Sequence, residues 1–321
     1  MITDFSIILL GLVALVWSAD RFIEGAAAIA GRAGMSPLLI GMTIVSVGTS
    51  APEILVSLMA ALSNSGELAV GNALGSNIAN IGLVLGITLL IAPIRVGKTT
   101  AFNDLPVLLI IVLLCAALLW DTTLSSGDAL LLFAALAVYL FRMARHVQAP
   151  DINDPEPTIS EMPLPRAIAT FAIGLLVLIV SSRALVWSAV NIAEGFGVSE
   201  LVIGLTIVAL GTSLPELAAS VVSAVKGHAD IAIGAVVGSN MFNLLIVLAL
   251  PGFFADLHLD AQALVRDLGT VMVSTLMLAV FTWASWQKTA NSAGLGRFAG
   301  GSFLALYVVY YLLLFSEIQN P

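Results

Sequence analysis

The feature that most constrains this chain is its series of long apolar runs. Two examples are FSIILLGLVALVW and LPVLLIIVLLCAALLW, neither of which contains a charged residue. About 20 apolar residues let a helix cross a bilayer, and neither run shows the strict alternation of a membrane β-barrel strand. Of the 321 residues, 60% are hydrophobic and only 10% are charged, whereas soluble proteins have about 25% charged residues. The sequence therefore predicts an all-α polytopic membrane protein.

The chain contains two copies of one unit. GMTIVSVGTSAPE (41–53) returns as GLTIVALGTSLPE (204–216), and VGNALGSNIAN (70–80) returns as IGAVVGSNMFN (233–243). At an offset of 163, residues 41–86 and 204–249 agree at 19 of 46 positions. ALVWSA likewise occurs at 14–19 and at 184–189. Internal duplication of this kind is common in transporters.

Apolar runs separated by loop signals predict five spans in each copy. The first five are 5–31, 37–62, 68–92, 104–120 and 127–144, and the second five are 167–193, 200–225, 230–250, 267–286 and 299–315. An odd number of crossings makes the second copy enter the membrane from the opposite side. We therefore predict ten transmembrane helices as two inverted-topology five-helix repeats, with a first half at 1–145, a linker at 146–165 and a second half at 166–321.

The distribution of basic residues predicts the orientation. With the N-terminus outside, the inner loops and helix ends hold nine Lys and Arg residues and the outer ones hold only Arg266. Cytoplasmic loops are enriched in Lys and Arg, so we expect both termini outside and the proline-rich linker in the cytoplasm. The start MITDFS has no Lys or Arg before the first apolar run, which predicts a permanent helix and not a cleaved signal.

Two glutamates occupy equivalent positions near the middle of predicted spans. Glu53 and Glu216 end the two copies of the GTSxPE motif. A carboxylate at mid-membrane costs roughly 2.5 to 3.5 kcal/mol on insertion scales. Because the repeat places this cost twice at matched positions, it favours a cation site shared by the two halves over a pair of protonated structural acids.

The residues around each glutamate predict a broken helix. Gly48 with Pro52, and Gly211 with Pro215, weaken the helical hydrogen bonding, and broken helices at membrane depth expose carbonyls that can bind ions. The same turns supply hydroxyl oxygens from Thr49, Ser50, Thr212 and Ser213. An all-oxygen set suits hard cations such as Na⁺ and Ca²⁺.

The GSN motifs predict a second wall for this site. Ser76 and Asn80 are four residues apart, as are Ser239 and Asn243, so each pair lies on one helix face. Small Gly75 and Gly238 would let that face approach a neighbour. The other intramembrane charges, Asp20, Arg21, Glu24 and Glu194, favour interfacial ion pairing or helix termination over a role in transport.

The paired GTSAPE and GTSLPE, together with GSNIAN and GSNMFN, resemble the two α-repeats of the calcium/cation antiporter superfamily, nearest to its prokaryotic sodium/calcium exchanger branch. The resemblance covers essentially the whole chain. It implies alternating Na⁺ and Ca²⁺ sites built from these residues: Ser46 through its carbonyl, Thr49, Ser50, Glu53, Ser76, Asn80, Ala209 through its carbonyl, Thr212, Ser213, Glu216, Ser239 and Asn243. Several members carry Asp where this chain has Asn243, so two carboxylates remain instead of three, which weakens the case for K⁺ transport.

These features predict a secondary active antiporter that exchanges Na⁺ for Ca²⁺ by alternating access, in the plasma membrane of a prokaryote. A Ca²⁺/H⁺ antiporter using the same glutamates is the main alternative, and a channel is a further one. An intramembrane enzyme is disfavoured because the spans lack a nucleophile or metal constellation. We expect no cofactor, Na⁺ and Ca²⁺ as transported ions, membrane lipid as surroundings, no nucleic acid and no obligate protein partner.

Overall fold

The computed structural model describes residues 2–32, 34–146, 162–196, 209–288 and 293–319. Most of the predicted linker (146–165) and the beginning of the predicted span 200–225 therefore lie outside the described residues. The expectation of an all-α membrane protein is confirmed, because nearly every described residue is helical and the long helices are apolar.

The first half contains α1 (Ile2–Arg32), α2 (Pro37–Ile40), η1 (Gly41–Val45), α3 (Ser46–Thr49), α4 (Ala51–Leu62), α5 (Gly66–Ala79), η2 (Asn80–Leu85), α6 (Gly86–Ile91), β1 (Ile94–Val96), η3 (Thr100–Asp104), α7 (Leu105–Leu118), β2 (Thr123–Leu124) and α8 (Ser126–His146). The second half contains α9 (Leu164–Gly195), α11 (Ala209–Thr212), α12 (Leu214–Val225), α13 (Ala229–Phe242), η5 (Asn243–Val247), η6 (Leu250–Phe253), β3 (Leu257–His258), α14 (Ala261–Lys288), β4 (Ala293–Leu295) and α15 (Arg297–Gln319).

Eight helices within the described residues are long and apolar enough to cross a membrane, and one bent pair, Pro37–Thr49 with Ala51–Leu62, makes a ninth candidate. The predicted span 200–225 is represented by the apolar helix Leu214–Val225 and the short α11 before it. Where the described residues cover them, predicted span ends agree with observed helix ends within six residues; the largest difference is at the predicted 267–286, which corresponds to α14 at Ala261–Lys288.

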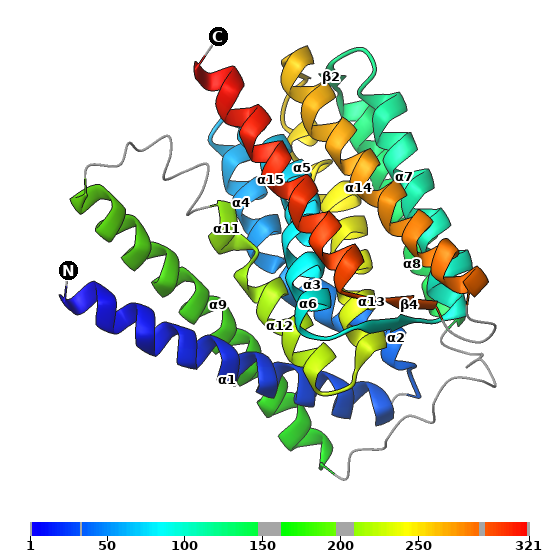
Figure 1. The fold of residues 1–321 in the computed structure, drawn as a ribbon. Coiled ribbons are helices and arrows are strands. Elements are labelled where there is room, and N and C mark those ends of the chain that lie inside the picture. The colour runs from blue at the N-terminus through cyan, green and yellow to red at the C-terminus, as the bar shows by residue number, and fades with distance from the viewer. Residues whose placement is uncertain (1, 33, 147–161, 197–208, 289–292, 320–321) are drawn as a thin grey trace.

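Helices α1 and α9 form a pair of long helices at one side of the bundle (Figure 1). They meet at two glycines: a Cβ added at Gly25 would lie 2.4 Å from the backbone nitrogen of Phe171, and one added at Gly174 would lie 2.5 Å from that of Phe22. A side chain at either position would therefore clash with the backbone of the other helix. The pair then packs on the rest of the bundle through a small apolar cluster that includes Leu15 and Ala219.

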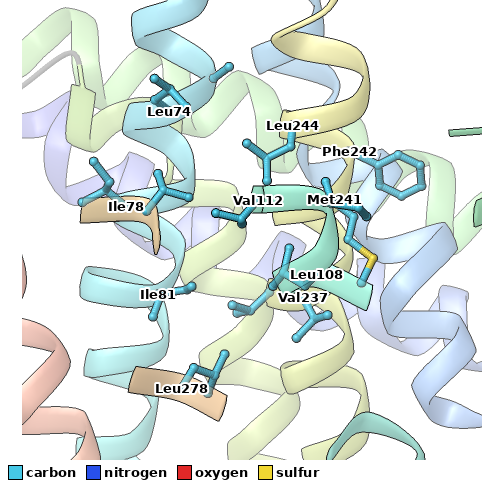
Figure 2. Packing of buried hydrophobic residues seen from close by; sticks show 14 of the residues in the cluster. Leu74, Ile78, Ile81, Leu108, Val112, Val237, Met241, Phe242, Leu244 and Leu278 are labelled. Atoms are coloured by element: carbon cyan, nitrogen blue, oxygen red, sulfur yellow. The ribbon is translucent and has the colours of Figure 1, made fainter. Parts of the chain in front are cut away.

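The main hydrophobic core surrounds α5 and α13, the helices that carry the two copies of the GSN motif. In the most apolar 18-residue stretch of the span Ala229–Phe253, 94% of the residues are buried, and in that of Gly66–Ile91 72% are buried. In the other single-helix spans that the structure describes, the buried share is 28% to 39%. Figure 2 shows Ile78 and Ile81 facing Leu108 and Val237 in this core. The third segment of each half is thus the most enclosed of the described candidate spans.

Two short antiparallel strand pairs join the halves, and no strand was predicted. β1 pairs with β4 through Ile94 and Leu295, and β2 pairs with β3 through Thr123 and His258. The pairs lie at opposite ends of the bundle, as the positions of β2 and β4 in Figure 1 show. Each pair therefore links a loop of the first half to a loop of the second.

Candidate cation site

Each copy of the GTSxPE motif forms a break between two helical segments. In the first copy Ser50 separates α3 from α4, and the helices on either side are bent by 44°. In the second copy Ser213 separates α11 from α12. Pro52 and Pro215 follow each break in the first turn of the next helix, where the missing N–H of proline is tolerated. The predicted helix breaks are therefore present in both copies.

Proline also leaves the carbonyl four residues earlier without its helical donor. In the second copy this carbonyl belongs to Gly211, and it accepts a hydrogen bond of 2.9 Å from Ser182 Oγ on α9. The carbonyl of Ser46, an implied ion ligand, accepts the Ser50 N–H at 2.9 Å and the Thr49 hydroxyl at 3.4 Å. The carbonyl of Gly211 therefore has a side-chain donor in place of its helical donor, and the carbonyl of Ser46 accepts a side-chain hydroxyl in addition to its helical donor.

Glu53 and Glu216 lie in the first turns of α4 and α12. A helix N-terminus favours negative charge, so the breaks help to hold both carboxylates inside the protein. Their exposed fractions are only 1% and 5%, and the two side chains are close enough to interact electrostatically. Two buried carboxylates of like charge destabilise each other unless a proton or a cation compensates.

Three of the four oxygens of these carboxylates lack a hydrogen bond. Within the described residues, Glu53 Oε2 and both side-chain oxygens of Glu216 are buried without a hydrogen-bond partner, and the Thr49 side chain lies close to Glu216. Buried polar atoms in native proteins almost always have a partner. An unpartnered set of carboxylate oxygens at this depth is what a site for a hard cation would require.

The two GSN motifs deliver their side chains across the boundary between the halves. α5 contacts α4, and α13 contacts both α12 and α3. Asn80 begins η2, which contacts α12, and Asn243 begins η5, which contacts α4. Each of these asparagines therefore sits on a segment packed against the glutamate helix of the other half, so both halves build the site.

Hydrogen bonds on one side of the site bind the halves together. The hydroxyls of Ser50 and Ser239 lie 2.7 Å apart. Asn80 Nδ2 donates to Ser239 Oγ and to Asn240 Oδ1, both at 3.0 Å. The polar side chains of Ser50, Asn80 and Ser239 are thus brought together as predicted, and all three are buried.

The equivalent side of the site is not bonded in the same way. Within the described part of the chain, Ser213 Oγ, both polar atoms of the Asn243 side chain and Asn77 Oδ1 are buried without a hydrogen-bond partner. Their counterparts at the offset of 163 are the bonded residues Ser50, Asn80 and Asn240. Within the described residues, Ser213 and Asn243 therefore lack bonds of the kind that Ser50 and Asn80 make. Asn77 and Asn240 are each bonded through one side-chain atom: Asn77 Nδ2 donates to Ala73 O at 2.8 Å, and Asn240 Oδ1 accepts from Asn80.

The remaining predicted residues are bonded to backbone or lie beside the site. Ser46 Oγ donates to the carbonyls of Gly41 and Ala235, at 2.6 and 3.1 Å. Thr49 Oγ1 donates to Val45 O at 3.1 Å and lies close to Glu216. Ser76 is buried on α5, and Ala209 is the first described residue of α11. Thr212 lines a small cavity next to the site.

That cavity lies between α9 and the two helix breaks. It measures about 40 Å³ and is lined by Pro52, Ile179, Ser182, Arg183, Val186, Gly211, Thr212 and Pro215. Since one water needs roughly 10 to 15 Å³ measured in this way, the cavity can hold a few waters. It connects a face of α9 to both proline breaks.

Three polar residues next to the site were not predicted to belong to it. Asn77 and Asn240 are the asparagines of the GSN triplets, so their repetition at the offset of 163 was a usable signal. Asn72 donates to the carbonyl of Glu53 and to Ser57 Oγ, both at 3.1 Å, and so holds α5 against α4. Ala235 stands at its repeat position, so no repetition marks Asn72.

The charges toward the end of α1 form ion pairs away from the glutamates. Arg21 pairs with Glu24 at 2.7 Å, and Asp20 pairs with Lys226 at the end of α12. These pairs agree with the prediction of ion pairing for Asp20, Arg21 and Glu24. Glu194 is exposed at the end of α9.

A family model described as sodium/calcium exchanger protein matches residues 3–144 and 166–316. The putative antiporter CaxA of Alkalimonas amylolytica is 42% identical over 97% of this chain and 98% of its own length. The sodium/calcium exchanger MaX1 of Methanosarcina acetivorans is 29% identical over 98% of this chain and 99% of its own. A solved structure of the sodium-calcium exchanger NCX_Mj, soaked without Na⁺ and Ca²⁺, superposes with a TM-score of 0.83 and 32% identity over 98% of this chain and 99% of that one.

Proposed function

Because this chain belongs to the sodium/calcium exchanger family, we propose that it is a secondary active antiporter that exchanges Na⁺ for Ca²⁺ across a prokaryotic plasma membrane. The observation that carries this proposal is the pair of buried glutamates, one from each half, three of whose four oxygens have no hydrogen-bond partner within the described residues. Two carboxylates carry a charge of −2, which either one Ca²⁺ or a group of Na⁺ ions can offset. Competition for one set of oxygens couples the two fluxes.

The proposed ligands are the side-chain oxygens of the two motifs together with carbonyls at the helix breaks. They are Thr49, Ser50, Glu53, Ser76, Asn80, Thr212, Ser213, Glu216, Ser239 and Asn243, with the carbonyls of Ser46 and Ala209. The orphaned oxygens of Glu53, Glu216, Ser213 and Asn243 support this set. All are oxygen ligands, as Na⁺ and Ca²⁺ prefer.

We further propose ten spans arranged as two inverted five-helix repeats, with halves at 1–145 and 166–321 and a linker at 146–165. Strand pairing supports this arrangement: β1 shifted by 163 residues falls on β3, and β1 pairs with β4 while β3 pairs with β2. Such reciprocal pairing at opposite ends is expected of an inverted repeat. Both termini would then lie outside and the linker in the cytoplasm.

Alternating access would come from movement of α1 and α9 against the helices that hold the site. These two helices pack on each other through glycines and form a separate pair in Figure 1. Ser182 of α9 binds the carbonyl of Gly211 at the helix break, so a shift of α9 would directly change the bonding of that break. An inverted repeat would make the two end states similar in energy.

The test is Ca²⁺ uptake into proteoliposomes driven by an outward Na⁺ gradient. We expect Glu53→Gln and Glu216→Gln each to lower the initial rate at least tenfold, because each removes one of two charges that compensate Ca²⁺. Glu67→Gln is the matched control, since Glu67 lies exposed in the first turn of α5. Full activity in both site variants would refute the shared site, and uptake driven equally well by a pH gradient alone would favour Ca²⁺/H⁺ exchange.

A further inference from the structure

Arg183 is an intramembrane charge that the proposed site leaves unexplained. It lies on α9, which is an apolar candidate span from Leu164 to Gly195, and it precedes the end of that helix by 12 residues, or roughly 18 Å of helix. The position that matches it in the first half, at the offset of 170 that pairs the ALVWSA copies, is Val13. The charge is therefore particular to one half of the molecule. Charged residues inside spans are costly and are retained mainly for function.

The surroundings of Arg183 connect it to the cation site. It lines the same cavity as Pro52 and Pro215, the prolines at the two helix breaks. Its positive charge interacts favourably with the carboxylate of Glu53. The Arg183 side chain is exposed, and among the described residues no carboxylate lies within salt-bridge distance of it.

The ordinary explanation for an arginine in a span is that its long side chain reaches toward the membrane surface. Arg21 on α1 shows what such a residue looks like here, because it is paired with Glu24 at 2.7 Å in a partly exposed position. Arg183 is exposed as well, but it differs in two ways: it lines the cavity beside the helix breaks, and its electrostatic partner is a proposed ion ligand. Both differences point to a role in ion binding.

We propose that Arg183 is a specificity-determining residue, a positive charge beside the cavity that raises the KM for Ca²⁺ by a larger factor than the KM for Na⁺, which is counted per ion. The inference rests on the proposed exchange function. Coulomb energy is proportional to the charge of the ion, so at equal distance Arg183 repels one Ca²⁺ twice as strongly as one Na⁺. Removing the charge should therefore increase Ca²⁺ affinity by about the square of the factor for a single Na⁺.

This charge would have a clear use in an exchanger. A site with two carboxylates holds a divalent ion more tightly than a monovalent one, and an ion held too tightly is released slowly. A nearby positive charge weakens the binding of Ca²⁺ and so favours Ca²⁺ release when the site opens toward the cavity. In this proposal Arg183 sets the balance between binding and turnover and does not touch the transported ion.

The experiment compares wild type, Arg183→Gln, Arg183→Lys and the control Arg21→Gln in the proteoliposome exchange assay at constant ionic strength. For Arg183→Gln we expect the KM for Ca²⁺ to fall about three- to tenfold, because the variant loses one repulsive charge whose effect on the ion is partly screened. The KM for Na⁺ should fall by a smaller factor, and the kcat should be lower. Arg183→Lys should retain the wild-type KM, since it keeps the charge, and Arg21→Gln should behave as wild type.

Ion-dependent thermal stabilisation in detergent measures the same affinities without transport. If Arg183→Gln is not recovered as a monodisperse protein, Arg183→Met becomes the deciding variant, because its unbranched side chain keeps the apolar packing. An unchanged KM for Ca²⁺ on charge removal would overturn the inference, as would an equal change in Arg183→Lys. Absence of Na⁺-dependent Ca²⁺ flux in the wild type would instead refute the proposed function.

Discussion

Asn243 is the residue whose chemistry most affects the charge of the proposed site. Its amide is buried, and neither of its polar atoms has a hydrogen-bond partner within the described residues. We predict that Asn243→Asp, which adds a third carboxylate at nearly the same volume, lowers the KM for Ca²⁺ about tenfold, or about 1.4 kcal/mol of binding free energy. Isothermal titration or Ca²⁺ uptake measures the change.

The control for this substitution is Asn64→Asp, which adds the same charge in an exposed turn after α4. Asn64 has a positive φ of 56°, which aspartate tolerates. A KM for Ca²⁺ that does not change in Asn243→Asp would place Asn243 outside the ion-binding site. The same shift in both variants would reflect surface charge alone.

Gly238 shows how a single residue sets the spacing of the site. A Cβ at this position would lie 2.3 Å from Ser46 Oγ and 2.7 Å from the carbonyl oxygen of Met42, so α13 must approach η1 and α3 without a side chain. We predict that Gly238→Ala destabilises the fold by roughly 1 to 3 kcal/mol, measured as a lower Tm in detergent. Gly301→Ala is the control, because within the described residues no atom lies within 4 Å of its added Cβ.

The expectation that Gly75 permits an equally close approach stays a prediction. No atom of the described residues lies within 4 Å of a Cβ at Gly75. Its partners by repeat symmetry would be Leu205, which lies outside those residues, and Ala209, which begins α11. A stability loss in Gly238→Ala no greater than in Gly301→Ala would show that backbone approach at Gly238 is not needed.

At the scale of elements, the proline breaks are the feature on which function should depend most. Both prolines lie in the first turn of a helix, where proline is tolerated, but each leaves the carbonyl four residues earlier without its helical donor. Pro52→Ala and Pro215→Ala restore that donor and should therefore allow straighter helices. We predict that each substitution raises the Tm or leaves it unchanged while exchange falls at least tenfold. Loss of activity together with a lower Tm would instead indicate general unfolding.

A matched control for these substitutions is Pro106→Ala. Pro106 also lies in the first turn of a helix, α7, but on a segment without proposed ligands. Exchange by this variant should remain at the wild-type rate. Unchanged exchange in Pro52→Ala and Pro215→Ala would contradict a role for the breaks.

The sequence was sufficient to predict the helices and the two breaks because both depend on local properties, namely apolar length and the Gly and Pro positions around Glu53 and Glu216. It did not predict the π-helical turns η2 and η5, which begin at Asn80 and Asn243. A π-turn inserts one residue into the helical register, and whether it forms depends on packing with neighbouring helices. Such turns are common at functional sites, which fits their positions here.

The different bonding of the two GSN motifs was also beyond prediction. Asn80 and Asn243 stand in nearly identical sequences, yet only Asn80 is bonded to Ser239 and Asn240. One sequence pattern can adopt both arrangements, so local reasoning cannot choose between them. In an inverted repeat the two arrangements would exchange between halves when access to the site alternates.

At the scale of the whole molecule, the ion pair between Asp20 and Lys226 joins the α1–α9 pair to the end of α12. If α1 and α9 move during transport, fixing this contact should stop exchange. We predict that a short bifunctional maleimide added to Asp20→Cys/Lys226→Cys in a Cys115→Ala background reduces Ca²⁺ uptake at least tenfold. Replacing Cys115, which is buried and the one native cysteine, prevents off-target reaction.

The control is the same reagent on Thr123→Cys/His258→Cys. These positions are register partners in the β2–β3 pair, and both lie in the part of the molecule that is proposed not to move. Cross-linking there should leave uptake at the level of the unreacted protein. Uptake that persists after complete cross-linking of the first pair would mean that α1 keeps its contact with α12 throughout the cycle.

The two strand pairs have a consequence for biogenesis. Because β1 and β2 find their partners in β4 and β3, the first half leaves the ribosome with two unpaired strand edges. Unpaired strand edges readily associate with other chains. The edges of β1 and β2 stay unpaired until the second half has been inserted. The order of synthesis therefore exposes the first half for the time needed to translate about 150 residues, and a chaperone or insertase that shields loop edges during that interval would protect the yield of folded protein.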